Sequence, residues 1–349
     1  MTLLTADAAP APSHLRGSGQ ARARRLRYVA GLAVAGVLTG VLPAVAGVPW
    51  GALATTVAGV PALWLVGLVT LWLAGLVSHT ITLTGAMPGL SHRRALTLSL
   101  TGSAVANVLP LGGAAGVALN VRMARAWHFS PQEITAYQVI TNVWDVLAKC
   151  LVPLVALPVL LLEHGVIAGH VLRLFAVTAP VLGVVALLGG TILASPLAAD
   201  RAGRLADRVL LRVRPQWTVH DHLVALQADT AVLVRERWRQ LSLGMTLYAA
   251  LLFLLLLGCL TATGAGLGIG AVLAGFAVER LLTLAGLTPG GAGVVEVGLT
   301  ATLLAFPGSS VGVVSGVILY RLLTFGLEIP VGGLTLGGWL WRRRTAGAA

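Results

Sequence analysis

Six ionisable side chains lie inside long apolar stretches of this sequence. An ionisable residue near the centre of a membrane helix costs roughly 2.5–3.5 kcal/mol on insertion scales, so each needs a partner or a function. Three of the six are acidic and three are basic, and as a set they carry no net charge: Asp145, Lys149, Glu279, Arg280, Glu296 and Arg321. We therefore expect pairing among them, or binding of the charged groups of a substrate.

The acidic residue Glu296 follows a break in an apolar segment. Within residues 284–306 the order Pro289, Gly290, Gly291 interrupts a sequence that could otherwise form a membrane helix. Proline removes an intrahelical hydrogen bond and glycine costs backbone entropy. Backbone amides and carbonyls freed by such a break must be satisfied by protein, water or a ligand, because hydrocarbon cannot satisfy them.

Two further apolar runs carry polar residues at helical spacing. In the last run, Tyr320, Arg321, Thr324 and Glu328 fall within about 100° of arc, and we expect Arg321 and Glu296 to line a polar cavity. In an earlier run the polar positions at steps of 4, 3 and 4 share one narrow helix face, and they are Gln138, Asn142, Asp145 and Lys149. The last two could neutralise each other or bind substrate, and the spacing favours neither.

The composition predicts an integral membrane protein. Of 349 residues, 57% are hydrophobic and only 10% charged, against about 25% charged in soluble domains, and the mean hydropathy is +0.89. The net charge of +12 comes from arginines between apolar runs, which indicates positive-inside topology and argues against nucleic-acid binding. We find no spacing typical of a metal, cofactor or disulfide site, and no nucleotide-binding loop or hydrolase signature that would name catalytic residues.

Runs of about 20 apolar residues, oriented by their arginine flanks, predict six membrane crossings. Residues 1–27 form a small, polar tail that we expect to be disordered and cytoplasmic. The run that follows it has features of a signal peptide, but a first membrane helix fits better. The crossings are about 28–48, 59–84, 132–162, 166–194, 241–263 and 309–341.

Two other apolar segments are predicted to be re-entrant hairpins. Segment 95–119 has basic residues at both ends, so both ends belong in the cytoplasm, although a kinked span is the alternative. Segment 271–306 must begin and end outside if the crossings on either side of it are correct. Hairpins of opposite orientation indicate an inverted repeat with a site near the midplane. The first turn contains Asn107, Pro110, Gly112 and Gly113.

The sequence favours one membrane domain, 28–344, with halves 28–194 and 241–344. Between them, 195–240 carries eight arginines and is predicted to be a cytoplasmic loop with amphipathic helices on anionic headgroups. The predicted fold class is an all-α, polytopic membrane protein.

A family resemblance lies in "LTPGGAGVVEVGLTATLLAF" and "GVVSGVILYRLLTFGLEIPVGG". These stretches resemble the lysylphosphatidylglycerol synthetase transmembrane-region family, with its Pro-Gly-Gly-x-Gly-x-x-Glu segment and later Tyr-Arg-Leu-x-Thr. "NVLPLGG" at 107–113 is similar to the first-half counterpart, and the resemblance spans about 30–344. The matching positions are Pro289, Gly290, Gly291, Gly293, Glu296, Tyr320, Arg321 and Thr324.

The resemblance implies a membrane domain that moves lipids between leaflets. In the best-known members a soluble aminoacyl-transferase domain follows, and the sequence ends at Ala349 without one, so we expect a stand-alone flippase-like protein. Its partner would be an anionic or zwitterionic phospholipid, an aminoacyl-phospholipid or a polyprenyl-linked carrier. A cell-membrane location with both termini cytoplasmic is expected, and a homo-oligomer is compatible with these features.

Roles follow for the charged residues of such a site. Arg280, Arg321 and Lys149 would attract phosphate, Glu296 and Asp145 would balance them or bind an amine or proton, and amides at the hairpin breaks would form an anion site. Two alternatives stay open. One is a membrane transferase that uses a carboxylate as a base, and the other is a scaffold that recruits a cytoplasmic partner through 195–240.

Overall fold

The fold is a bundle of helices. The computed structural model describes residues 40, 43, 44, 46–109, 112–162, 169–210, 220–284 and 288–346. Among these residues every regular element is helical, and five helices are long and apolar enough to cross a membrane. They match five of the predicted crossings, so the all-α polytopic membrane class is confirmed. The predicted tail 1–27, nearly all of the first crossing and Pro110 lie outside the described residues.

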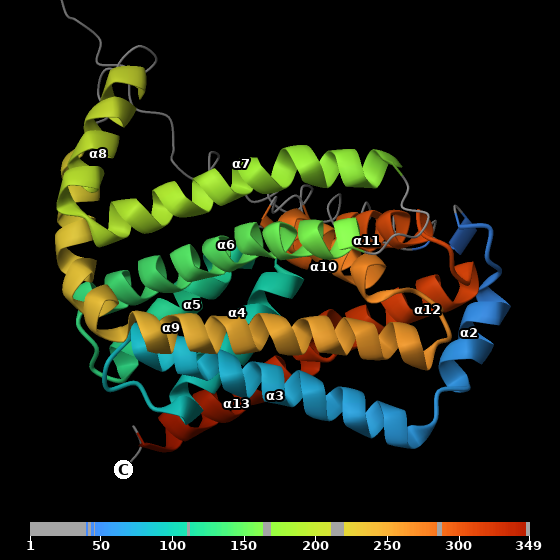
Figure 1. Ribbon diagram of the computed structural model, residues 1–349. Coiled ribbons are helices and arrows are strands. Elements are labelled where there is room, and N and C mark those ends of the chain that lie inside the picture. The colour runs from blue at the N-terminus through green and yellow to red at the C-terminus, as the bar shows by residue number, and fades with distance from the viewer. Residues whose placement is uncertain are drawn as a thin grey trace, which may run out of the picture.

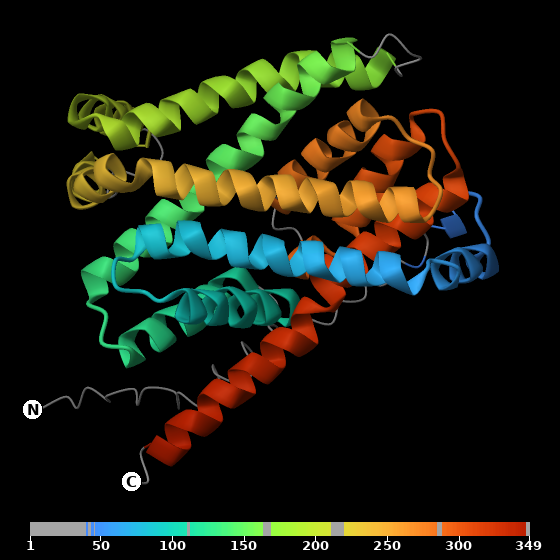
Figure 2. The ribbon, with the colours of Figure 1, turned by 60° about the horizontal axis from the view of Figure 1, so that its bottom comes forward.

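Helices α3, α6, α7 and α9 make up most of the bundle, α13 slants away from it, and α2 lies at one end (Figures 1 and 2). The bounds of these helices and of the short α12 are Trp50–Ala58 for α2, Ala62–Ala86 for α3, Pro131–Leu162 for α6, Gly169–Ala194 for α7, His220–Ala262 for α9, Ser310–Arg321 for α12 and Glu328–Ala346 for α13.

Helices α3 and α9 form an antiparallel pair through the bundle. Near the end of α3, the Thr82 hydroxyl donates a hydrogen bond to the Leu241 carbonyl at 3.0 Å. At the start of α3, Leu68 lies against Gly258, which is near the end of α9. Small residues let membrane helices approach closely, since lipid tails give no hydrophobic drive for helix association. Because the pair is antiparallel, the last residues of α3 and the last residues of α9 lie at opposite ends of the bundle.

Two shorter helical hairpins start from opposite ends of this pair. Helices α4 (His92–Val108) and α5 (Gly112–Ala126) follow the end of α3, whereas α10 (Ile269–Leu284) and α11 (Val294–Leu304) follow the end of α9. Each is shorter than the ~20 residues needed to span a bilayer. Helical hairpins are thus present at 95–119 and 271–306, and their tips meet, while their re-entrant placement in the membrane stays a prediction. Inverted two-fold symmetry between the halves stays a prediction.

The segment 195–240, predicted to be a loop with amphipathic helices, is largely helical where it is described, but its second helix is not separate from the next membrane span. It contains α8 (Pro196–Leu210), and α9 continues through residue 240 into the membrane span without interruption. Residues 220–243 contain no glycine or proline, so nothing in the sequence ends the helix before the membrane span. The 43 residues of α9 correspond to a helix length of about 64 Å at 1.5 Å per residue. The first part of α9 packs beside α8, away from the bundle (Figure 1).

Candidate functional site

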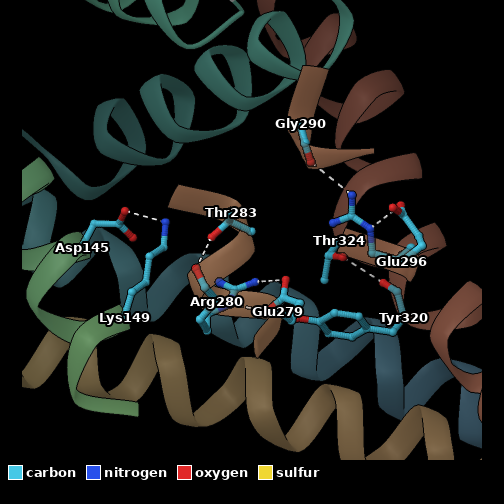
Figure 3. A network of polar contacts seen from close by, with 10 residues as sticks. Asp145, Lys149, Glu279, Arg280, Thr283, Gly290, Glu296, Tyr320 and Thr324 are labelled. Carbon is cyan, nitrogen blue, oxygen red and sulfur yellow. Dashed lines mark hydrogen bonds and ion pairs between the residues drawn. The ribbon is translucent and has the colours of Figure 1, made fainter. Parts of the chain in front are cut away.

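A buried ion pair joins α11 to α12. The Nε of Arg321, the last residue of α12, donates to the Oε1 of Glu296 at 2.7 Å. Their side chains are 10% and 7% exposed, respectively. Glu296 lies in the first turn of α11, directly after the break that the sequence placed there. The predicted proximity of these two residues is therefore observed (Figure 3).

Further bonds tie this ion pair to the hairpin tip. The Nη2 of Arg321 donates to the Gly290 carbonyl at 3.1 Å, so the guanidinium satisfies a carbonyl freed by the break. Its plane also lies over the Phe325 ring, 5.1 Å from the centroid. Phe325 belongs to a π-helical turn, Leu322–Gly326, that interrupts the run predicted as one helix at 309–341. Single π turns are frequent at functional sites.

The amides at the second break are not all open to an external anion. The Gly293 amide donates to the Oε2 of Glu296 at 2.6 Å, which places a carboxylate at the start of α11. A carboxylate there is stabilised by the orphan amides and the helix dipole. Of the amides expected to form an anion site, that of Gly293 is therefore already occupied by Glu296 itself.

The tips of the two hairpins contact each other. A short 3-10 turn, Pro289–Gly291, lies against both α4 and α5. Gly290 has φ +57° and faces Asn107, the penultimate residue of α4. Across the first break, Gly112 is buried against the Ala106 carbonyl. Gly113 is exposed, and a Cβ atom added there would meet no described atom within 4 Å. Asn107 and Gly290 thus bring the two breaks together, and their placement at the membrane midplane stays a prediction.

A second ion pair lies on α10. Glu279, fully buried, accepts hydrogen bonds from the neighbouring Arg280, whose guanidinium lies 5.3 Å from the Phe276 centroid. The ring of Tyr320 points toward this pair from α12 (Figure 3). Within the described part of the chain its buried hydroxyl has no hydrogen-bond partner. Among the described residues, Tyr320 therefore brings a donor without a partner to the side of the Glu279–Arg280 pair (Figure 3).

The third pair lies apart from the other two. On α6, the Nζ of Lys149 is 2.7 Å from the Oδ2 of Asp145, and their side chains are 14% and 39% exposed. In Figure 3 it lies on the far side of the Glu279–Arg280 pair from Glu296. The two residues are thus paired with each other and lie apart from the hairpin tips, and a role in binding substrate stays a prediction.

Some buried polar residues beside the ion pairs were not singled out as site residues. The His79 ring stacks on Tyr248 with centroids 4.5 Å apart. Glu328, buried in the first turn of α13, lies beside Ser103 and Trp72. Glu328 belongs to the polar face that the sequence revealed, whereas His79 is a lone histidine in an apolar run and gave only a weak signal.

A comparison with known families agrees with this architecture. The family model described as "Lysylphosphatidylglycerol synthase TM region" matches residues 28–332. That range includes all three ion pairs and both hairpins. A comparison with curated proteins found no match.

Proposed function

Because this chain belongs to the lysylphosphatidylglycerol synthase TM region family, we propose that it moves a lipid with an anionic or zwitterionic headgroup between membrane leaflets. The lipid would be a phospholipid, an aminoacyl-phospholipid or a polyprenyl-linked carrier. The protein would lie in the cell membrane with its arginine-rich ends, and therefore both termini, in the cytoplasm. A homo-oligomer remains compatible with this function.

One observation carries the proposal: the Glu296–Arg321 pair lies where the two broken hairpins meet. Burying two charges is expensive, and apolar residues of similar volume often stabilise a protein as well or better. An ion pair at two backbone breaks therefore fits a site for a polar headgroup better than a purely structural role. The buried Tyr320 hydroxyl, which has no hydrogen-bond partner among the described residues, is a further donor for such a headgroup.

On binding, the headgroup would replace the contact between Glu296 and Arg321 with its own contacts to each of them. A lipid phosphate suits the guanidinium of Arg321, since arginine binds phosphate with two parallel hydrogen bonds. An amine of a zwitterionic or aminoacyl headgroup would bind the Glu296 carboxylate. Arg280 and Lys149 would attract phosphate along the path, with Asp145 balancing the charge. Without a nucleotide-binding loop, movement would be downhill or coupled to an ion gradient.

The test uses purified protein in liposomes that contain fluorescent phosphatidylglycerol. A membrane-impermeant quencher added outside reports how fast lipid from the inner leaflet reaches the outer leaflet. We compare the wild type with Glu296→Gln, Arg321→Gln and the double variant. Removing one partner of a buried pair costs about 3–5 kcal/mol because the other charge is left uncompensated, so the single variants should be less stable.

The double variant separates structure from function. It leaves no isolated charge, and we expect it to regain thermal stability while lipid movement stays at the level of empty liposomes. Arg204→Gln on exposed α8 is the matched control and should move lipid normally. Wild-type movement by a stable double variant would reject the site. Mass spectrometry of the same lipids distinguishes a transferase, which would change their mass.

A further inference from the structure

A basic pocket lies at one end of the bundle, away from the ion pairs. It is formed by the first turns of α4, the turn after α5 and the last turns of α13, the helix that leads to the C-terminus in Figure 2. Its volume is about 490 Å³. The lining residues are Arg93, Arg94, Thr97, Trp127, Thr335, Gly338, Trp339, Arg342 and Arg343.

No residue that the structure describes neutralises the charges of this pocket. Four arginines line it, all of them exposed, and no acidic residue is among the lining. In the described ranges of the chain none of these four forms an ion pair. By contrast, Arg280 and Arg321 in the bundle interior are each paired with a glutamate. The pocket therefore offers four positive charges to an external anion.

Two tryptophans hold part of this charge in place. The Arg94 guanidinium lies 5.3 Å from the Trp127 ring centroid, and that of Arg343 lies 5.1 Å from the Trp339 ring centroid. Cation–π contacts of this kind orient a guanidinium without using its N–H donors. Both tryptophans are half-buried, and tryptophan is enriched where membrane helices reach the headgroup layer. The pocket thus combines guanidinium groups that are held in a fixed orientation with the amphipathic side chains of two tryptophans.

The hydroxyl groups in the pocket are already engaged. Thr97 donates to the Arg93 carbonyl at 2.8 Å, and Thr335 donates to the Val331 carbonyl at 2.7 Å. The donors that face a ligand are therefore mainly those of the arginines. A guanidinium presents a planar fork that matches phosphate oxygens.

We propose that this pocket binds the phosphate of an anionic membrane lipid. Its position at the helix ends, beside interfacial tryptophans, places it at headgroup depth, where such lipids are concentrated. A net anionic headgroup suits it better than a zwitterionic one, because the uncompensated arginines would repel an amine. Binding here does not depend on lipid movement through the hairpins, so it can be measured alone.

The experiment titrates full-length protein in detergent with dioctanoyl phosphatidylglycerol and follows binding by thermophoresis. The test variant is Arg94→Gln with Arg343→Gln. The matched control is Arg122→Gln with Arg125→Gln, which removes the same charge from exposed positions of α5 outside the pocket. Each lost charge-assisted bond should weaken binding by about tenfold or more. We therefore expect a large increase in Kd for the test pair and little change for the control.

Further arms identify the source of the phosphate. Dioctanoyl phosphatidylcholine should bind more weakly than phosphatidylglycerol, and inorganic phosphate at the same concentration should not displace the lipid. Displacement by inorganic phosphate would overturn the assignment to a lipid. Equal weakening by both variant pairs would show attraction by net charge alone and overturn the site. A lysine pair, Arg94→Lys with Arg343→Lys, keeps the charge and should recover only part of the affinity, since it lacks the fork.

Discussion

The side-chain oxygen of Asn107 lies so close to Gly290 that a Cβ atom on residue 290 would stand 2.5 Å from it. The two residues belong to different hairpins, which begin at opposite ends of the α3–α9 pair. Their contact is therefore the point at which the two breaks meet. A glycine is required at 290 for a second reason, because its φ of +57° lies in the left-handed region.

Gly290→Ala should damage both stability and lipid movement. The left-handed backbone costs a non-glycine residue about 1–2 kcal/mol, and the new Cβ would also crowd Asn107 and the Phe325 ring. We expect a lower unfolding temperature and at least a severalfold loss of movement in the liposome assay. Gly67→Ala on α3 is the control, since an added Cβ there would meet nothing within 4 Å. Equal behaviour of the two variants would mean that the tips are not packed as described.

Tyr320→Phe separates a functional hydroxyl from a structural one. The Tyr320 side chain is fully buried, and its hydroxyl lacks a partner among the residues described. Deleting an unsatisfied buried polar group is nearly neutral for stability or favourable. We expect an unchanged or higher unfolding temperature together with slower lipid movement, as measured in parallel on one preparation. Tyr137→Phe, at a buried tyrosine of α6 in another core cluster, should leave movement unchanged. Normal movement by Tyr320→Phe would remove this hydroxyl from the site.

Two adjacent glycines of α13 offer a test of helix packing. Gly332 lies against α4, where an added Cβ would clash with the Leu100 carbonyl, while Gly333 faces open space. Gly332→Ala should lower stability by about 1–3 kcal/mol through overpacking. Gly333→Ala should be neutral or stabilise by up to about 1 kcal/mol from helix propensity. Thermal unfolding of the two variants gives the comparison, and the reverse order would contradict the α4–α13 contact.

Much of the architecture could be predicted because it depends on local signals. Apolar length and arginine flanks predicted the crossings, and the break at Pro289 to Gly291 predicted a hairpin tip in the bundle. Opposite charges in apolar runs predicted ion pairs, and all six residues are paired. These features follow from the cost of exposing charges or backbone groups to hydrocarbon.

The remaining features depend on packing between distant segments. The Asn107–Gly290 contact joins two hairpins whose relative depth no spacing rule gives. Glu296 occupies an amide of its own helix start, although the sequence alone also allowed a free anion site there. The basic pocket needs Arg94 and Arg343 in one place, and nothing local in either segment indicates this proximity.

The orientation of the hairpins in the membrane can be tested by cysteine labelling. Cys150 and Cys259 are buried, so their replacement by alanine should give a silent background. In that background we place a cysteine at Arg125, in the last turn of α5, or at Pro307, an exposed position between α11 and α12. Arginines concentrate on the cytoplasmic side, so Arg125→Cys should react with an impermeant thiol reagent only after the cells are opened. Pro307→Cys lies at the opposite end of the bundle and should react in intact cells. Labelling of both from one side would show that the hairpins do not open to opposite faces, and a midplane site between their tips would then lose its basis.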